Sequence, residues 1–178
     1  MSTIEQPHYT RIQPFSTHIE SRLYAPMHIA QVEVEADSRK EAINQGFRMI
    51  ARYIFGDNTA QDKIAMTSPV QQTRSTKTAD HTAWKISFVM PSKFTLDTLP
   101  KPHNTDIQLL AVPEQRFIVI RFSGLMSQSN LDKHEKILRN AVKKNNLSTI
   151  GEVKYAFYNP PWTLPVFRRN EVMLQLAD

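Results

Sequence analysis

The chain has 178 residues, of which 40% are hydrophobic and 22% are charged, as in an ordinary globular protein. It contains no run approaching the ~18 apolar residues of a membrane-spanning helix, and no secretory signal begins it, so we expect a cytoplasmic protein without a membrane partner. The absence of cysteine excludes disulfides, thiolate metal ligands and cysteine nucleophiles.

The net charge of +5 would suit an anionic partner, nucleic acid included. On a helix predicted over 131–146, however, the basic residues share one arc, and Leu131 and Leu138 lie on the opposite arc. This pattern is typical of a solvated face beside a core face. Because no aromatic residues alternate with these charges to stack on bases, we expect no nucleic-acid partner.

We predict a loose N-terminal arm over 1–15 and a single domain over 16–178. Alternating apolar residues predict two strands joined in a hairpin at Ala25-Pro26, with Ile19 facing Val32 and Leu23 facing His28. A helix with a capping box from Ser38 to Glu41 follows and ends at Gly56. Strands are then predicted over 63–70 and 82–90, with a polar loop over 71–81 between them.

The C-terminal half repeats this order. A hairpin is predicted around Pro113, then a helix that begins with a capping box from Ser129 to Asp132, then strands over 153–158 and 172–176. We expect Glu171 to pair with a neighbouring arginine in a charged turn before the last strand.

The two halves, about 16–91 and 105–177, therefore read as a duplicated β-β-α-β-β unit. Pro26 and Pro113 lie 113 − 26 = 87 positions apart, and Pro69 and Pro160 lie 160 − 69 = 91 apart. We predict an α+β fold in which two four-stranded sheets form a distorted antiparallel barrel flanked by two helices.

Three segments carry a family resemblance: Lys63-Ile64-Ala65-Met66-Thr67-Ser68-Pro69-Val70, Tyr158-Asn159-Pro160-Pro161 and Arg168-Arg169-Asn170-Glu171-Val172. In this order and at this separation they resemble the SOUL haem-binding protein family, from about Phe15 to Leu176. The resemblance implies a pseudo-twofold architecture and the binding of haem or another tetrapyrrole.

No motif for catalysis accompanies these segments, so we predict a protein that is not an enzyme. The chain lacks a Walker loop, GxGxxG, HExxH and GxSxG, and His134 is expected to be a satisfied, half-buried helix residue. In some family members a proposed haem-ligating histidine precedes the first hairpin turn, but Leu23 takes that place here. We predict no metal site; His28 is the remaining candidate axial ligand, and an ordinary strand histidine is the favoured interpretation.

Other members of the family are thought to hold tetrapyrroles in an apolar groove between the first helix and the loop before the last strand. On the predicted helix, three residues follow i, i+4, i+8 spacing beside the core stripe, and two arginines lie on its polar side. Such a surface suits a flat apolar ring with two carboxylates. The predicted binding residues are Phe47, Arg48, Ala51, Arg52, Phe55, Trp162 and Leu164.

Two alternatives remain open. The phenylalanines of the first helix could pack under strands, with Trp162 covering the barrel end. The same apolar patch could also bind a protein partner or a small effector, because the duplicated plan resembles effector-binding domains of the GyrI-like kind.

Overall fold

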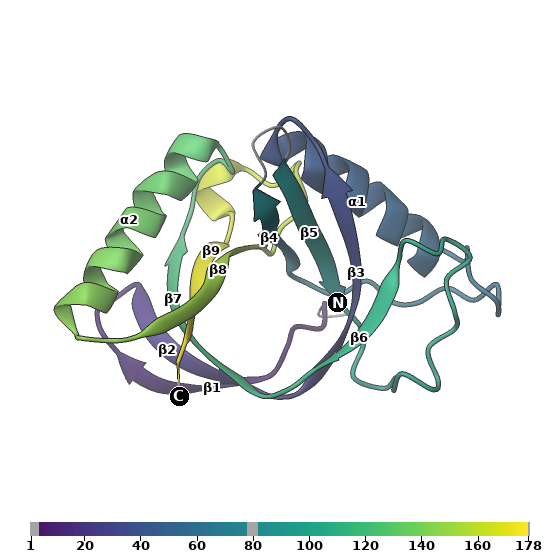
Figure 1. The fold of residues 1–178 in the computed structure, drawn as a ribbon, viewed down its shortest axis with the longest axis horizontal. Coiled ribbons are helices and arrows are strands. Elements are labelled where there is room, and N and C mark those ends of the chain that lie inside the picture. The colour runs from purple at the N-terminus through teal and green to yellow at the C-terminus, as the bar shows by residue number, and fades with distance from the viewer. Residues whose placement is uncertain (1–3, 78–81, 178) are drawn as a thin grey trace. The chain divides into compact units, whose positions relative to one another are not determined.

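The computed structural model describes residues 4–77 and 82–177. The chain divides into two compact units: the first unit comprises Met1–Pro7 and Pro26–Pro113, and the second comprises His8–Ala25 and Glu114–Asp178. Each unit contains an antiparallel sheet with one α-helix packed on it (Figure 1). The predicted α+β class with two helices is confirmed.

The first unit contains four strands in the order β4-β5-β3-β6 and the helix α1. Val32 of β3 pairs with Ile86 of β5, and both side chains are buried. The elements are β3 (Met27–Glu35), α1 (Arg39–Ile54), β4 (Val70–Lys77), β5 (Thr82–Val89) and β6 (Gln108–Val112).

The helix α1 begins where the sequence predicted. Ser38 is its N-cap, and the Ser38 side chain accepts a hydrogen bond of 3.1 Å from the backbone N–H of Glu41. The face of α1 that contacts β3 and β5 is buried and includes Gly46, Ile50 and Ile54. Its end is marked by Gly56, whose φ of 119° lies in the region that glycine adopts at low cost.

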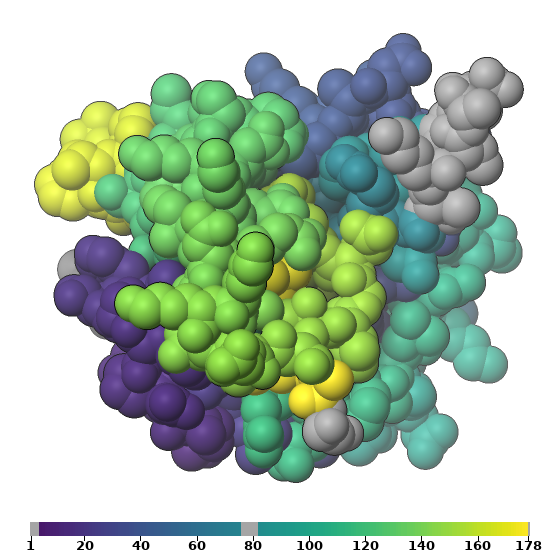
Figure 2. Space-filling view, turned by 60° about the vertical axis from the view of Figure 1, so that its left-hand side comes forward, coloured from purple at the N-terminus to yellow at the C-terminus, as the bar shows by residue number. Residues whose placement is uncertain are grey.

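The second unit contains five strands in the order β1-β2-β7-β9-β8 and the helix α2. Leu131 and Leu138 of α2 are fully buried where the helix packs on β7 and β9, and its basic side chains are exposed. Figure 2 shows the outer face of α2 (green) toward the viewer. The elements are β1 (Tyr9–Pro14), β2 (Ile19–Tyr24), β7 (Gln115–Phe122), α2 (Gln128–Lys144), β8 (Thr149–Phe157), the short 3-10 helix η1 (Pro165–Phe167) and β9 (Asn170–Leu176).

The predicted hairpins are wrong. Ile19 of β2 pairs with Ile120 of β7, whereas Val32 pairs with Ile86 in the first unit. His28 pairs with Ala111 of β6 rather than facing Leu23. The turns at Ala25-Pro26 and Pro113 coincide with the passage of the chain from one unit to the other. Alternation identifies the buried face of a strand, but several strands with matching faces can be its partner.

Three local predictions also need correction. The segment Tyr9–Pro14, expected in a loose arm, is β1 and pairs with β2. A strand was expected over 63–70 and a loop over 71–81, but the strand runs over Val70–Lys77. Pro69 has no backbone N–H to donate, so pairing begins after it, and the polar residues that follow form hydrogen bonds within the sheet. Residues 78–81 of that predicted loop lie outside the described residues.

The start of α2 differs by two residues from the prediction. Its N-cap is Ser127, which accepts a hydrogen bond from the backbone N–H of Asn130, and Ser129 lies inside the helix. Within residues 4–77 and 82–177, no helix combines the length and the apolar character needed to cross a membrane.

Candidate functional site

The predicted binding residues of the first unit lie on α1, except Phe55, which is the C-cap residue directly after it. Phe47, Ala51 and Phe55 form one flank of the helix, beside its buried face, and Arg48 and Arg52 follow on the solvent side because successive residues advance by about 100°. We call these five residues the α1 flank.

Two phenyl rings of the α1 flank are open to solvent. Phe55 is 60% exposed, and Phe47 is 36% exposed although its ring packs on Phe88, with 5.4 Å between ring centres. Phe55 therefore does not pack beneath the strands, and Phe47 does so only in part. Large exposed apolar side chains at neighbouring positions are typical of an interaction site.

The two arginines of the α1 flank are free to bind an anion. In the part of the chain that the structure describes, neither Arg48 nor Arg52 forms an ion pair with a carboxylate. Arg48 donates only a long hydrogen bond, 3.2 Å, from Nε to the backbone oxygen of Asn44. A guanidinium whose remaining donors face solvent can bind a carboxylate through two parallel hydrogen bonds.

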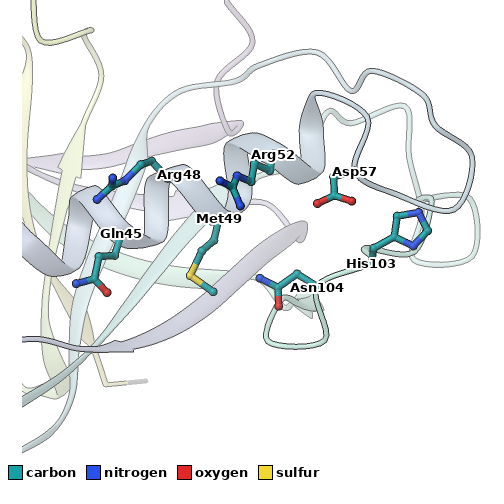
Figure 3. A pocket seen from close by; sticks show the side chains of 7 residues that line it. All are labelled: Gln45, Arg48, Met49, Arg52, Asp57, His103 and Asn104. Carbon is teal, nitrogen blue, oxygen red and sulfur yellow. The ribbon is translucent and has the colours of Figure 1, made fainter.

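A cavity of about 540 Å³ adjoins the solvent side of α1. Figure 3 shows that four of the lining side chains come from α1 and that His103 and Asn104 come from a separate loop. The volume lies within the range of small-molecule sites. The lining residues are Gln45, Arg48, Met49, Arg52, Asp57, His103 and Asn104.

The loop opposite α1 is held in place by backbone contacts. The N–H of His103 donates to the backbone oxygen of Asp57 at 3.3 Å, and the N–H of Thr59 donates to that of Lys101 at 2.9 Å. Tyr53 of α1 donates from its hydroxyl to the Pro100 oxygen at 2.8 Å, and burial raises the pKa of Tyr53 to about 12. The hydroxyl thus stays protonated as a donor, which fixes this wall of the cavity.

Sequence reasoning did not find His103, Asn104 and Asp57 as neighbours of α1. His103 lies about fifty positions after the helix in a proline-rich connection, and no periodic pattern links the two. The segment directly after α1 is ordered by Asn58, which is fully buried and donates to the backbone oxygens of Tyr53 and Asp62.

The predicted residues Trp162 and Leu164 belong to the second unit. Trp162 is 83% exposed, so it covers little of the protein, and Leu164 is exposed as well. Their loop is nevertheless ordered by Arg168, whose Nε donates to the Thr163 oxygen at 2.7 Å and whose Nη2 donates to the Pro161 oxygen. The loop thus presents large apolar side chains on a fixed backbone.

The candidate axial ligand His28 is half-buried in β3. Within residues 4–77 and 82–177, no group of three or more His, Cys, Asp or Glu side chains is arranged to hold a bare metal ion.

Comparison with known proteins gives a match over nearly the whole chain. The family model described as SOUL heme-binding protein matches residues 4–175. The human protein named Heme-binding protein 2 is 30% identical over 159 residues, which cover 87% of this chain and 76% of the human protein.

Solved structures also share the fold. The C-terminal domain of EcmrR has a TM-score of 0.70 at 8% identity, covering 90% of this chain and 97% of that domain. SAV2435, solved bound to tetraphenylphosphonium, has a TM-score of 0.55 at 8% identity, covering 90% of this chain and 94% of SAV2435. At such low identity these likenesses concern the fold alone.

Proposed function

Since the chain belongs to the SOUL haem-binding protein family, we propose that it binds haem or a related tetrapyrrole on the α1 flank without catalysing a reaction. The observation that carries this proposal is the exposure of Phe47 and Phe55 beside two arginines that have no carboxylate partner among the described residues.

The chemistry of the α1 flank fits such a ligand. A tetrapyrrole is a planar apolar ring, which the two phenyl rings can contact, and its carboxylates can be bound by the guanidinium groups of Arg48 and Arg52. Ala51, between the two phenylalanines, is small enough to let the ring approach the helix. Haem would supply redox-active iron when bound; these five residues would hold the ring and its acid groups.

A titration with metal-free protoporphyrin IX tests the proposal, because this probe presents the ring and the acid groups alone. We expect saturable binding at micromolar protein, seen as a change in the absorption of the probe. In Phe47→Ala/Arg48→Ala we expect the affinity to fall at least tenfold. Absence of binding by the wild type, or an unchanged affinity of the double variant, would remove the proposal.

The chain offers a matched control for this variant. Lys93 and Phe94 are also an adjacent cation and aromatic ring of the first unit, with Lys93 Nζ 4.9 Å from the Phe94 ring centre. Lys93→Ala/Phe94→Ala should bind protoporphyrin as the wild type does. Trp162→Ala and Leu164→Ala, titrated in the same way, test whether those two side chains contribute.

A second candidate function is the binding of a small effector in the cavity beside α1. It is supported by the volume of that cavity and by the fold shared with SAV2435. Arg48 and Arg52 outnumber Asp57 along its wall, so an anionic effector fits better than a cation such as tetraphenylphosphonium. Tetraphenylphosphonium binding that Asp57→Asn abolishes would favour a cationic effector instead.

A further inference from the structure

The second unit contains a separate cavity of about 700 Å³, which we call the His134 cavity. Its apolar wall comes from β2, β7, α2 and η1, and includes Phe122, Ile137 and Phe167. Figure 2 shows the η1 segment (yellow) protruding beside α2 (green), and residues of both line the cavity.

The imidazole of His134 is fixed in one orientation at this cavity. Its ring stacks on Phe122, with 3.8 Å between ring centres and 7° between ring planes. Its Nδ1 lies 2.7 Å from the backbone oxygen of Asn130. A carbonyl oxygen only accepts, so Nδ1 must carry the hydrogen, and in the neutral ring Nε2 holds the lone pair.

This arrangement is the one that metal-bound histidines adopt. A histidine that binds a metal through one nitrogen commonly donates the other N–H to a backbone carbonyl, which sets the tautomer and the ring orientation. No hydrogen-bond partner for Nε2 occurs among the described residues. His134 was predicted to be a satisfied, half-buried residue; it is half-buried, but only its Nδ1 has a partner in the described part of the chain.

The charges at the His134 cavity favour an anionic ligand. Arg121 and Arg168 line it, and no carboxylate does so among the residues that the structure describes. Arg168 is held by the loop carbonyls of Thr163 and Pro161, so its guanidinium is positioned before any ligand arrives.

A second histidine, His18, also lines the cavity, but no contact among the described residues fixes its ring as Phe122 and the Asn130 oxygen fix that of His134. The cavity thus combines an apolar wall, positive charge and a held imidazole with a free lone pair on Nε2.

We propose that the His134 cavity binds a metal-bearing planar ring with carboxylate substituents, such as iron protoporphyrin, and that Nε2 of His134 coordinates the metal. The ligand class rests on the proposed function, but the site is distinct from the α1 flank and involves none of its residues. Such a ring would supply the other nitrogen ligands of its metal itself, so His134 would be the one ligand needed from the protein.

Electron paramagnetic resonance and absorption spectra of the protein with hemin test this assignment. The wild type should give the spectrum of histidine-ligated ferric haem, and His134→Phe should lose it while keeping an aromatic ring against Phe122. His18→Phe, which changes the other histidine that lines this cavity, should keep it. Arg121→Ala should lower the hemin affinity three- to tenfold with the ligation spectrum retained.

The two proposals can fail independently. If His134→Phe keeps the histidine-ligated spectrum, or if the wild type never shows it, the His134 assignment is overturned whatever happens with protoporphyrin. If Phe47→Ala/Arg48→Ala binds metal-free protoporphyrin normally, the α1 flank proposal fails, and the hemin spectra still decide the role of His134. Circular dichroism of each variant verifies that loss of a signal is not loss of the fold.

Discussion

Arg22 and Glu171, which are 149 positions apart in the chain, form a bidentate ion pair inside the second unit. Arg22 Nη1 lies 2.9 Å from Glu171 Oε2, and Nη2 lies 3.1 Å from Oε1. Both side chains are buried, Arg22 at 3% exposure and Glu171 at 0%. The pair joins β2 to β9, although β7 lies between them in the sheet.

The carboxylate of Glu171 has further donors around it. Arg169 Nε donates to it at 2.9 Å and the Tyr158 hydroxyl at 3.0 Å. Burial alone would lower the pKa of Arg22, but the charge and hydrogen bonds of Glu171 raise it above its usual value. Burial and the nearby Glu171 charge also raise the pKa of Tyr158. The expected pairing of Glu171 with a neighbouring arginine is confirmed, within a buried strand rather than a turn.

Glu171→Ala should therefore lower the free energy of unfolding by about 3–5 kcal/mol, because it leaves the buried charge of Arg22 without its main partner. Urea denaturation of the variant measures this loss. Glu20→Ala is the control, since Glu20 also bonds to Arg22, at 2.6 Å, but is 20% exposed and should cost less. Equal losses in the two variants would contradict the role assigned to Glu171.

Lys154 in β8 gives a prediction that depends on pH. Its Nζ lies 5.0 Å from the ring centre of Phe117, and burial lowers its pKa from 10.5 to about 8. The folded state binds this proton less readily than the unfolded state does. The free energy of unfolding therefore contains the full contribution of neutral Lys154 above pH 10.5 and loses it as the pH falls through 8. At pH 7 the charged lysine is therefore a cost to the folded state.

Replacing Lys154 by methionine should remove that cost. We expect the stabilisation by Lys154→Met to be about 3 kcal/mol larger at pH 7 than at pH 11, from the difference between the two pKa values. Unfolding curves at a series of pH values measure it, and Lys143→Met on the exposed face of α2 should show no such trend. A stabilisation that stays constant with pH would contradict the burial of a charged Lys154.

Gly46 allows α1 to approach the sheet closely. A Cβ atom at this position would lie 2.5 Å from Cγ1 of Ile86, which is fully buried in β5. Gly46→Ala should lower the free energy of unfolding by about 1–2 kcal/mol, because overpacking outweighs the better helix propensity of alanine.

The same contact predicts coupling between the two positions. In an Ile86→Ala background, where Cγ1 is absent, Gly46→Ala should cost less than in the wild type, as a double-mutant cycle by denaturation would measure. Strict additivity of the two changes would show that Gly46 does not serve this contact.

Local chemistry made part of this fold predictable from the sequence. Ser38 and Glu41 start α1 as expected because capping depends on residues within one turn, and Ile50 and Ile54 are buried because the apolar period matches the helix. Strand partners were not predictable, because the residues of β2 and β3 alternate equally well against several neighbours. The strand β4 was missed because Gln72 looks like a loop residue until Arg39 binds its side chain, at 3.1 Å.

The candidate site was likewise predictable only in part from the sequence. The positions of Phe47, Phe55, Arg48 and Arg52 around α1 follow from helix geometry, so the sequence predicted their grouping. The approach of His103 and Asn104 to the helix depends on the path of a long connection. The free Nε2 of His134 depends on a side-chain rotamer, which no sequence pattern records.

The central claim is that a tetrapyrrole binds against the α1 flank, and nuclear magnetic resonance of the ¹⁵N-labelled protein with metal-free protoporphyrin IX tests it most directly. A bound planar ring shifts the resonances of nearby nuclei, so we predict the largest shift changes at Asn44–Gly56, saturating with added probe and absent in Phe47→Ala/Arg48→Ala. Saturable shifts confined to other parts of the chain, with α1 unaffected, would contradict the claim.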